Sequence, residues 1–370
     1  MPAPLLFLIH SLGQGGGERQ LCQTALALDR DRFAPHVASV LGGFHEERLT
    51  QAGVPVWRLP LKSLTGWSAV RSARLLRQYV RRHGIRLVHT FDYTLTVFGI
   101  PVIRTCPGTV ALAGQRCFLE LVPSKYRLPL RLSLRLAHGI AVNSYALREH
   151  LAGDYGFPTG RIHVCHNGID TEAFRPQPKQ RLPELEQAGL VLGTVCVLRP
   201  EKNLGVLLQA FARLRARHPS LRLLIAGGGP ESESLQRQCR QLGIQNHCLF
   251  RPSSQQVAPY LRSIDVFVHP AISEGLPNSV MEAMAAGCCV VASDAEGCSE
   301  LITHRITGLL FRNNDLQDLE RQLQTVIEDE PLRLSLAKAA AERIPEEFSM
   351  QQSARCLEKI YEGFLARHRA

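Results

Sequence analysis

Two glutamates with seven residues between them are the first candidates for chemistry in this sequence. Glu274 lies in the turn "SEGLP", after the apolar run 264–270 and before a helical stretch. Pro277 suits the first position of that helix, and Glu282 lies inside it. Ligands of open α/β sheets bind beyond the carboxyl ends of the strands, which is where Glu274 is expected. The alternative is that Glu274 only favours the helix N-terminus and that Glu282 is a solvated helix residue.

Glycines and cations occupy other turns between strands and helices. The turn "GQGGGER" contains three consecutive glycines, Gly15, Gly16 and Gly17. Backbone N–H groups at a helix N-terminus bind phosphate well. Arg199 and Lys202, in "RPEKN", come after a strand and before a helix. Two cations at that point would neutralise a diphosphate, unless they belong only to a solvated loop.

Several other nucleotide chemistries are excluded. In the first glycine-rich turn, Glu18 stands where a dinucleotide-binding motif has its third glycine. The second expected strand ends in glycines, where such a motif has a ribose-binding acid. The sequence has no GxxxxGK[ST] motif, and its histidines and carboxylates have no metal-ligand spacing. A nicotinamide oxidoreductase, a P-loop ATPase and a metal site are therefore not expected.

The elements that position these residues follow one pattern twice. Short apolar runs, each with a helical stretch after it, are predicted as strands at 5–9, 36–41, 86–90, 109–113 and 139–144, then at 191–198, 221–229, 247–250, 264–270 and 288–293. This alternation predicts an α/β protein of two doubly wound, Rossmann-like domains facing a cleft. The polar, proline-bearing segment 174–189 is expected to link them. The expected limits are 1–175, 176–345 and a C-terminal helix, 346–370, packing back toward the first domain.

The composition restricts the partners and the compartment. The chain of 370 residues has 43 basic and 33 acidic side chains, a net charge of +10 that favours nucleotides or phospholipid surfaces. Nucleic acid is not expected, because no recognition motif accompanies the arginines. No apolar run approaches the roughly 20 residues that span a bilayer. Eleven cysteines without a CxxC pair suit a reducing cytosol, so a cytoplasmic protein is predicted.

Four ordered segments resemble a known family. They are "RPEKN", "LLIAGGGPE", "IDVFVHPAISEGLPNSVMEAMAAG" and "GCSELITHRITGLLF", with "GGGER", "NSYALREHL" and "HNGID" in the first half. Together they resemble retaining nucleotide-sugar glycosyltransferases of the GT-B fold, group 1 or family 4, most strongly over 191–311. The resemblance implies transfer of a sugar, with retention of configuration, from a nucleotide diphosphate to an acceptor hydroxyl. The expected acceptor is a saccharide or lipid-linked saccharide of a surface polysaccharide.

The resemblance also implies roles for the candidate residues. Glu282 would bind the ribose hydroxyls of the donor. Glu274, in a turn with Gly275, Leu276 and Pro277, would act as the catalytic residue that holds the donor sugar near the reacting carbon. Lys202 and Arg199 would bind the diphosphate, and the three glycines at 15–17 would let the first domain approach the phosphates and the acceptor. No metal and no cofactor besides the donor are expected, because cations and helix ends stabilise the leaving diphosphate.

Two departures from the family pattern leave alternatives open. Val197 stands where members commonly carry an arginine, and Arg199 is the expected substitute. Phe91 occupies the position of the active-site histidine in an "HxH" segment. Either His89 or Asp92 compensates as a catalytic residue, or His89 is a core histidine at a strand end. The departures also keep a catalytically inactive nucleotide-sugar-binding protein open, beside a GT-B epimerase or a phosphorylase, although no feature marks a pyridoxal lysine.

A basic and apolar helix is predicted near residues 127–139. Arginines and leucines recur there every four residues: Arg127, Arg131 and Arg135, then Leu128, Leu132 and Leu136. On a helix they form neighbouring basic and apolar stripes. The helix either faces the core with a solvated edge or contacts anionic lipid on the inner face of the membrane, where a lipid-linked acceptor would be met.

Overall fold

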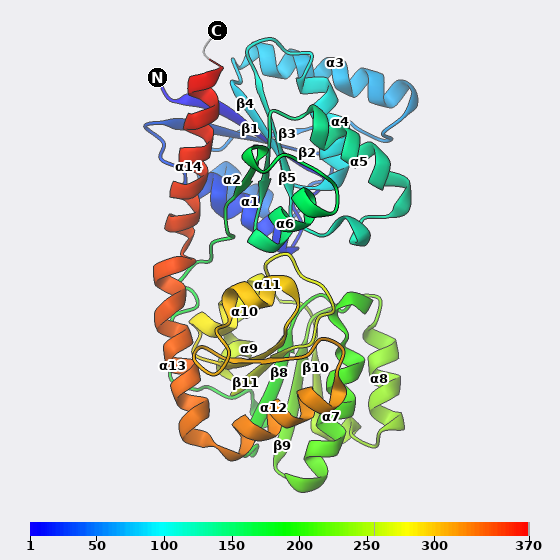
Figure 1. The fold of residues 1–370 in the computed structure, drawn as a ribbon, viewed down its shortest axis with the longest axis vertical. Helices are drawn as coiled ribbons and strands as arrows, with labels where there is room; N and C mark the ends of the chain where they lie inside the picture. Colours follow the sequence, from blue (N-terminus) through cyan, green and yellow to red (C-terminus); the bar gives the residue numbers. More distant parts are fainter. Residues whose placement is uncertain (255, 369–370) are drawn as a thin grey trace. The chain divides into compact units, whose positions relative to one another are not determined.

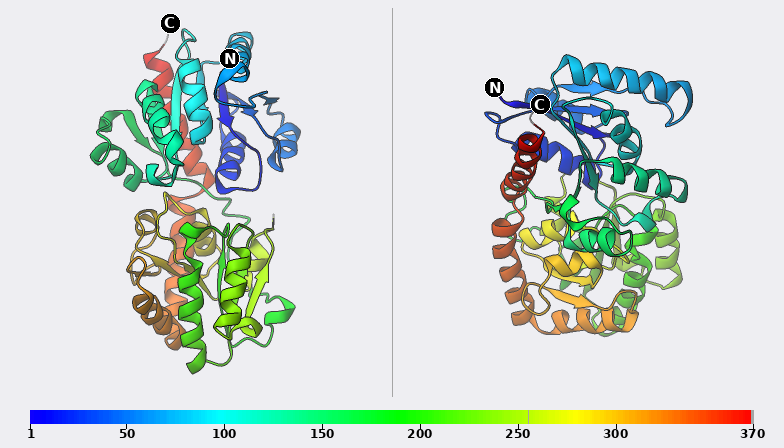
Figure 2. Two further views of the ribbon diagram at one scale, coloured as in Figure 1. Left: turned by 90° about the vertical axis from the view of Figure 1, so that its right-hand side faces the viewer. Right: turned by 45° about the horizontal axis from the view of Figure 1, so that its top comes forward.

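The computed structural model describes residues 1–254 and 256–368, which form two compact units. The first unit consists of residues 1–168 together with the last helix of the chain, from Met350 onward. The second unit consists of residues 169–349. In each unit, helices cover both faces of a parallel β-sheet (Figures 1 and 2).

The first unit contains a seven-stranded sheet within the described residues, in the order β3-β2-β1-β4-β5-β6-β7. Its strands are β1 Ala3–Ile9, β2 Phe33–Ser39, β3 Val56–Arg58, β4 Leu87–Thr90, β5 Val110–Gln115, β6 Gly139–Val142 and β7 Ile162–Val164. Its helices are α1 Gly16–Ala27, α2 His45–Gln51, α3 Gly66–Arg82, α4 Tyr93–Ile103, α5 Ser124–Leu136, α6 Tyr145–Gly153 and α14 Met350–Arg367, with short 3-10 turns η1 Leu119–Leu121 and η2 Thr159–Arg161.

The described part of the second unit contains a six-stranded sheet in the order β10-β9-β8-β11-β12-β13. Its strands are β8 Leu190–Val195, β9 Leu221–Ala226, β10 Cys248–Arg251, β11 Val266–His269, β12 Cys289–Ser293 and β13 Leu309–Phe311. Its helices are α7 Leu204–Arg217, α8 Ser232–Gln241, α9 Ala258–Arg262, α10 Asn278–Ala285, α11 Glu296–Leu301, α12 Leu316–Glu328 and α13 Glu330–Glu347, with 3-10 turns η3 Pro183–Leu185, η4 Pro200–Lys202 and η5 Gln245–His247.

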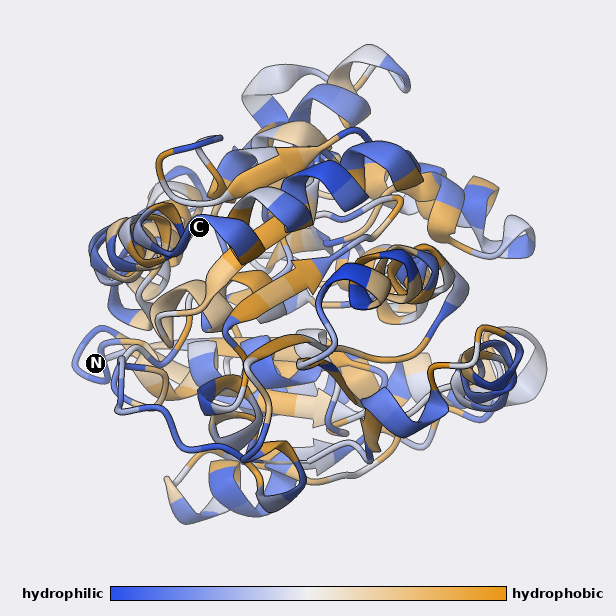
Figure 3. Ribbon diagram, turned by 90° about the horizontal axis from the view of Figure 1, so that it is seen from below, coloured by the Kyte–Doolittle hydropathy of each residue, from blue (hydrophilic) through white to orange (hydrophobic). Residues whose placement is uncertain are grey.

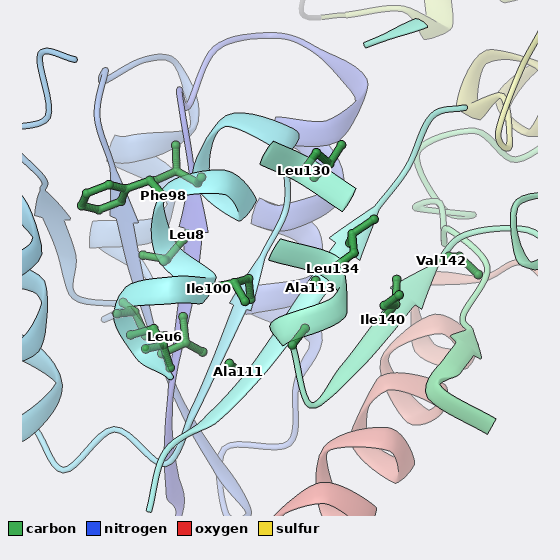
Figure 4. Packing of buried hydrophobic residues seen from close by; sticks show 14 of the residues in the cluster. Leu6, Leu8, Phe98, Ile100, Ala111, Ala113, Leu130, Leu134, Ile140 and Val142 are labelled. Carbon is green, nitrogen blue, oxygen red and sulfur yellow. The ribbon is translucent and has the colours of Figure 1, made fainter. Parts of the chain in front are cut away.

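Alternating side chains of the buried strands build two hydrophobic layers in each unit. In β1, Leu6 and Leu8 pack under α3, α4 and α5, as Figure 4 shows in part, whereas Leu5, Phe7 and Ile9 pack under α1, α2 and α14. Both faces of a parallel sheet are covered, so its strands are mostly apolar and do not show a regular alternation of apolar and polar residues. Figure 3 shows the strands mostly in the hydrophobic colour and the helices in mixed colours.

Some elements differ from those the sequence predicted. β3, β7 and β13 have three residues each, too few for a recognisable apolar run. The strand expected over 139–144 ends at Val142, because Ser144 caps α6 by accepting the N–H of Leu147 at 3.2 Å. The C-terminal helix expected over 346–370 begins at Met350, because α13 extends as far as Glu347.

The boundary between the units also differs from the predicted one. The chain passes into the second unit at Ile169, and it returns to the first at Met350. The expected linker, 174–189, belongs wholly to the second unit. It is attached there because Arg181 pairs with Asp265 at 2.8 Å and the N–H of Leu182 is hydrogen-bonded to Ser263.

Helix α14 completes the core of the first unit. Tyr361 is fully buried against Phe7 and Phe33, and its hydroxyl lies 2.8 Å from Nδ1 of His89. The ring of Phe364 packs against Gly139, where an added Cβ would lie 2.3 Å from it. The last helix therefore belongs structurally to the first unit, although the whole second unit, residues 169–349, precedes it along the chain.

We expect Tyr361→Ala to destabilise the first unit by about 3–5 kcal/mol, because it removes a buried aromatic side chain and leaves His89 without its partner. Both tryptophans, Trp57 and Trp67, belong to this unit, so denaturant unfolding followed by tryptophan fluorescence reports on it selectively. Lys359→Ala, at an exposed position of the same helix, is the control and should change the free energy of unfolding little. Equal stability of the two variants would contradict the role given to α14.

Candidate functional site

Lys202 and Glu274 meet in the second unit. Lys202 ends η4, which follows β8, and Glu274 lies in the loop that follows β11. The two strands are neighbours in the sheet, so their carboxyl ends share one edge. A backbone hydrogen bond of 2.9 Å from the N–H of Ile272 to the carbonyl of Glu201 joins the two loops. The Lys202 ammonium then pairs directly with Oε1 of Glu274.

His269 is a third member of this cluster. It ends β11, its side chain is 1% exposed, and its Nε2 lies 3.1 Å from the same Oε1 of Glu274. No motif in the sequence indicates His269 as a site residue. The one sequence feature that could have indicated His269 is its position: it is a polar residue at the end of an otherwise apolar strand, five positions before Glu274.

The charges of this cluster stabilise one another. Burial by itself raises the pKa of Glu274, but the Lys202 ammonium and the hydrogen bond from His269 oppose it and lower the pKa from 4.5 to about 2. Burial lowers the pKa of Lys202, yet Glu274 outweighs this and raises it overall. Burial lowers the pKa of His269, so its ring is neutral near pH 7. The site thus holds one carboxylate, one ammonium and one neutral imidazole, mostly shielded from water.

Close backbone packing holds the loop that carries Glu274. The N–H of Gly297, near the start of α11, donates to the carbonyl of Glu274 at 3.1 Å. A Cβ at Gly297 would lie 2.1 Å from the carbonyl oxygen of Gly275 and is sterically impossible without a shift. Asn203 adopts the left-handed conformation that asparagine tolerates, which turns the chain from Lys202 into α7.

The remaining residues of the "EGLPNSVME" segment lie next to this loop. Gly275, Leu276 and Pro277 are buried, and Leu276 belongs to the core under α10. Pro277 precedes α10 rather than beginning it, since the helix starts at Asn278. Glu282 lies within α10 and is 3% exposed, so it is not the solvated helix residue that the alternative required.

Arg199 stands apart from the Lys202–Glu274 pair. Its side chain is 60% exposed and reaches Glu201 at 3.8 Å. Val197 is also exposed. Arg199 thus has the freedom to reach a bound anion, although nothing in its described contacts directs it toward Glu274.

The three glycines of the first unit lie at the start of α1. Gly15 is the N-cap residue, and Gly16 and Gly17 begin the helix. A Cβ on Gly17 would meet no heavy atom within 4 Å, whereas a Cβ on Gly15 would lie 2.2 Å from the carboxylate of Glu18. That carboxylate accepts a hydrogen bond of 2.8 Å from Ser11 and lies at the helix end where negative charge is favoured.

The first-unit catalytic candidates occupy structural positions. His89 is fully buried between Tyr361 and Phe91, and burial together with Arg116 lowers its pKa well below the ordinary value. This placement matches the core-histidine alternative, and a catalytic role would need an exposure that His89 lacks. Asp92 caps α4 by accepting the N–H of Leu95 at 2.9 Å, so its carboxylate is also committed to the fold.

Among residues 1–254 and 256–368, no group of histidine, cysteine or carboxylate side chains has the arrangement of a metal site. All eleven cysteines are free thiols.

Two family descriptions match the chain, one for each half. Residues 14–173 match "Glycosyltransferase Family 4", and residues 179–343 match "Glycosyl transferases group 1". Among curated proteins, a D-inositol 3-phosphate glycosyltransferase of Corynebacterium aurimucosum is 30% identical over 72% of this chain and 66% of its own length. A GDP-mannose-dependent phosphatidylinositol monomannoside mannosyltransferase of Mycolicibacterium smegmatis is 30% identical over 49% of this chain and 51% of its own. Matches to the curated relatives span 39% to 66% of their lengths.

Solved structures share the whole fold. The crystal structure of Anabaena HepE with UDP and glucose superposes with a TM-score of 0.86 at 21% identity, over 98% of this chain and 100% of that one. Sucrose-phosphate synthase from Thermosynechococcus elongatus gives a TM-score of 0.84 at 18% identity, over 99% and 100%. These matches confirm the prediction of two Rossmann-like domains of the GT-B fold.

The depressed pKa of Glu274 predicts a loss of stability in acid. The unfolded chain takes up a proton at this carboxyl near pH 4.5 and the folded chain only near pH 2, so stability falls as the pH drops through this window. Between pH 5 and pH 3, wild type should lose about 2 kcal/mol more than Glu274→Gln does. Calorimetric unfolding of the second unit measures this difference, with the exposed Glu233→Gln as control. A parallel decline of wild type and Glu274→Gln would contradict the assigned pKa.

Proposed function

The chain is built from the two domains of the GT-B glycosyltransferases, a family 4 domain followed by a group 1 domain, and from this premise we propose that it transfers a sugar from a nucleotide diphosphate sugar to an acceptor hydroxyl with retention of configuration. The observation that carries the proposal is the meeting of Lys202 and Glu274 at the carboxyl edge of the second sheet. A cation suited to a diphosphate and a carboxylate suited to a sugar then lie side by side. The transfer needs no metal in this proposal, since Lys202 and Arg199 supply positive charge to the leaving diphosphate.

The donor and the acceptor are proposed from chemistry and from relatives. Solved neighbours contain UDP or UDP-glucose, which supports a nucleotide sugar as the donor. Relatives named for D-inositol 3-phosphate and for a phosphatidylinositol mannoside support a hydroxyl acceptor on a polar or lipid-linked carbohydrate. We assign this chain a saccharide or lipid-linked saccharide acceptor of a surface polysaccharide.

The two glutamates are proposed to act at different stages of the reaction. Glu282 grips the ribose of the donor, a contact that is equally present before and during the reaction. Glu274 acts where the glycosidic bond breaks and positive charge develops on the sugar, so its carboxylate matters most in the transition state. Its low pKa keeps it ionised for that purpose.

Activity assays also distinguish this function from two alternatives. A GT-B epimerase or phosphorylase would convert or release the sugar without joining it to a second carbohydrate. A catalytically inactive protein would bind nucleotide sugars without turnover, which the departures at Val197 and Phe91 make worth testing.

The first test is a thermal-shift screen with UDP, GDP, ADP and their sugars, because a ligand that binds the folded state raises the melting temperature. The best nucleoside diphosphate should bind Lys202→Ala at least about tenfold more weakly, since a charge-assisted hydrogen bond contributes about 1.5–3 kcal/mol. The nucleoside without phosphates is the control and should bind both proteins alike. Arg199→Ala should weaken the diphosphate too if Arg199 replaces the arginine missing at 197, and an unchanged affinity would exclude that substitution.

Substitution of the two glutamates should separate their roles. Glu282→Gln should raise the donor KM with little change in kcat, the signature of lost uniform binding. Glu274→Gln should lower kcat and kcat/KM together by about 30- to 1,000-fold, as when one positioned catalytic hydrogen bond is lost, while nucleoside diphosphate binding survives. Steady-state kinetics, calorimetry and NMR of the product anomer provide the measurements. An inverted product would refute retention, and wild-type kinetics in both variants would refute both roles.

We extend the proposal to a membrane surface, on the evidence of α5. Its buried residues are Leu130, Ser133 and Leu134. The three leucines of the predicted stripe point away from the core and are 63%, 51% and 49% exposed: Leu128, Leu132 and Leu136. An exposed apolar row beside arginines fits the surface of an anionic bilayer, where each basic residue contributes roughly 1 kcal/mol. No helix of the described residues combines the length and apolarity needed to cross a bilayer.

Liposome flotation tests this contact. The protein should float with anionic vesicles and remain at the bottom with neutral ones, and Leu128→Ser with Leu132→Ser should reduce its recovery. Leu334→Ser, at a 60% exposed leucine of α13, is the matched control and should float like wild type. Equally low recovery with both kinds of vesicle would exclude peripheral binding.

A further inference from the structure

His269 occupies a position from which it can control Glu274. The residue ends β11, which lies between β8 and β12 in the second sheet. His269 itself pairs with Ala292 of β12 in the strand register. β8 pairs with β11 only at Val266 and Phe267, so β12 is the strand that holds the backbone at His269, and a residue held in a sheet is positioned more firmly than one on a loop such as Glu274. The imidazole is therefore a fixed point beside a carboxylate on a loop.

One oxygen of Glu274 receives two hydrogen bonds from different elements. Nε2 of His269 lies 3.1 Å from Oε1, and the Lys202 ammonium pairs with the same atom. An ionised carboxylate is only an acceptor, so the imidazole must donate, and its hydrogen must be on Nε2. The second oxygen of Glu274 is not used by either contact.

The two donors respond differently to a bound diphosphate. Lys202 is charged, and a diphosphate competes with Glu274 for it. His269 is neutral because burial lowers its pKa, so an anion gains little by displacing Glu274 from it. When Lys202 turns to the diphosphate, His269 remains as the contact that fixes the orientation of Glu274.

We propose that His269 is a positioning residue, whose Nε2–H holds the Glu274 carboxylate toward the donor sugar while Lys202 engages the diphosphate. The inference rests on the proposed function for the roles of Lys202 and Glu274, and it adds a residue that the resemblance to the family did not assign. The positioning role predicts that His269 contributes to kcat but contributes little to the affinity for the donor.

The experiment compares two substitutions of His269. His269→Leu removes the donor, and kcat should fall at least about tenfold while the donor KM and the nucleoside diphosphate affinity change less than about threefold. His269→Gln places an amide N–H near the position of Nε2 and should restore most of kcat. Val268→Ala is the control, since its buried side chain belongs to the other hydrophobic layer of the sheet and the substitution disturbs the packing of the same strand away from His269. Equal losses in the Leu and Gln variants, or a loss confined to KM, would overturn the proposal.

A second measurement does not depend on turnover. In protein labelled with ¹⁵N-histidine, NMR should show His269 neutral and protonated at Nε2 near pH 7, and Glu274→Gln should shift that resonance. A ring protonated at Nδ1 alone, or a resonance insensitive to Glu274→Gln, would refute the hydrogen bond itself. If the NMR result holds but wild type transfers no sugar from any donor, the proposed function has failed and the positioning role fails with it.

Discussion

The candidate site of the second unit depends on the largely buried ion pair between Lys202 and Glu274. Two charges taken largely out of water lose hydration, and their attraction offsets that loss only when the geometry is fixed and further hydrogen bonds are available. Each supporting feature of the site supplies one of these conditions. The backbone bond between Ile272 and Glu201 fixes the two loops, and His269 provides the additional donor. Gly297 allows the close approach that seats the loop.

The same arrangement explains why a buried ion pair is compatible with ligand binding. An ion pair whose two side chains have no other hydrogen-bond partner would resist separation, because separating them leaves each buried charge without a partner. In the function proposed here, a diphosphate replaces the carboxylate at Lys202, and His269 stays with the carboxylate. The cluster is therefore suited to exchange partners without exposing an unpaired charge, which fits the function proposed for it.

The first unit uses its polar residues differently. Near the carboxyl edge of its sheet, His89 is bonded to Tyr361 within the core and Asp92 caps α4. Both side chains stabilise the fold, and neither is presented as an acid or a base. The glycine turn at the start of α1 is open at Gly17 and carries the carboxylate of Glu18 beside Gly15. The chemistry of the described site is thus concentrated in the second unit, which also contains the motifs with the strongest resemblance to the family.

The sequence by itself determined the class of the fold and selected candidate site residues, two of which, Lys202 and Glu274, the structure brings into contact. Repeated apolar runs with helical stretches between them are sufficient to predict parallel sheets, because both faces of such a sheet are buried. The segments "RPEKN" and "SEGLPNSVME" made Lys202 and Glu274 candidates, since each follows an apolar run and precedes a helical stretch. Tertiary structure decided the rest. Three-residue strands give no periodic signal, so the sequence does not predict β3, β7 and β13.

Whether a histidine at a strand end is catalytic or structural depends on which residues pack over it. For His89 that is Tyr361, 272 positions away in sequence, and for His269 it is Glu274, on a loop whose path is set by contacts with η4. Local sequence specifies which residues a strand presents, but only the packing of distant segments decides which of them meet.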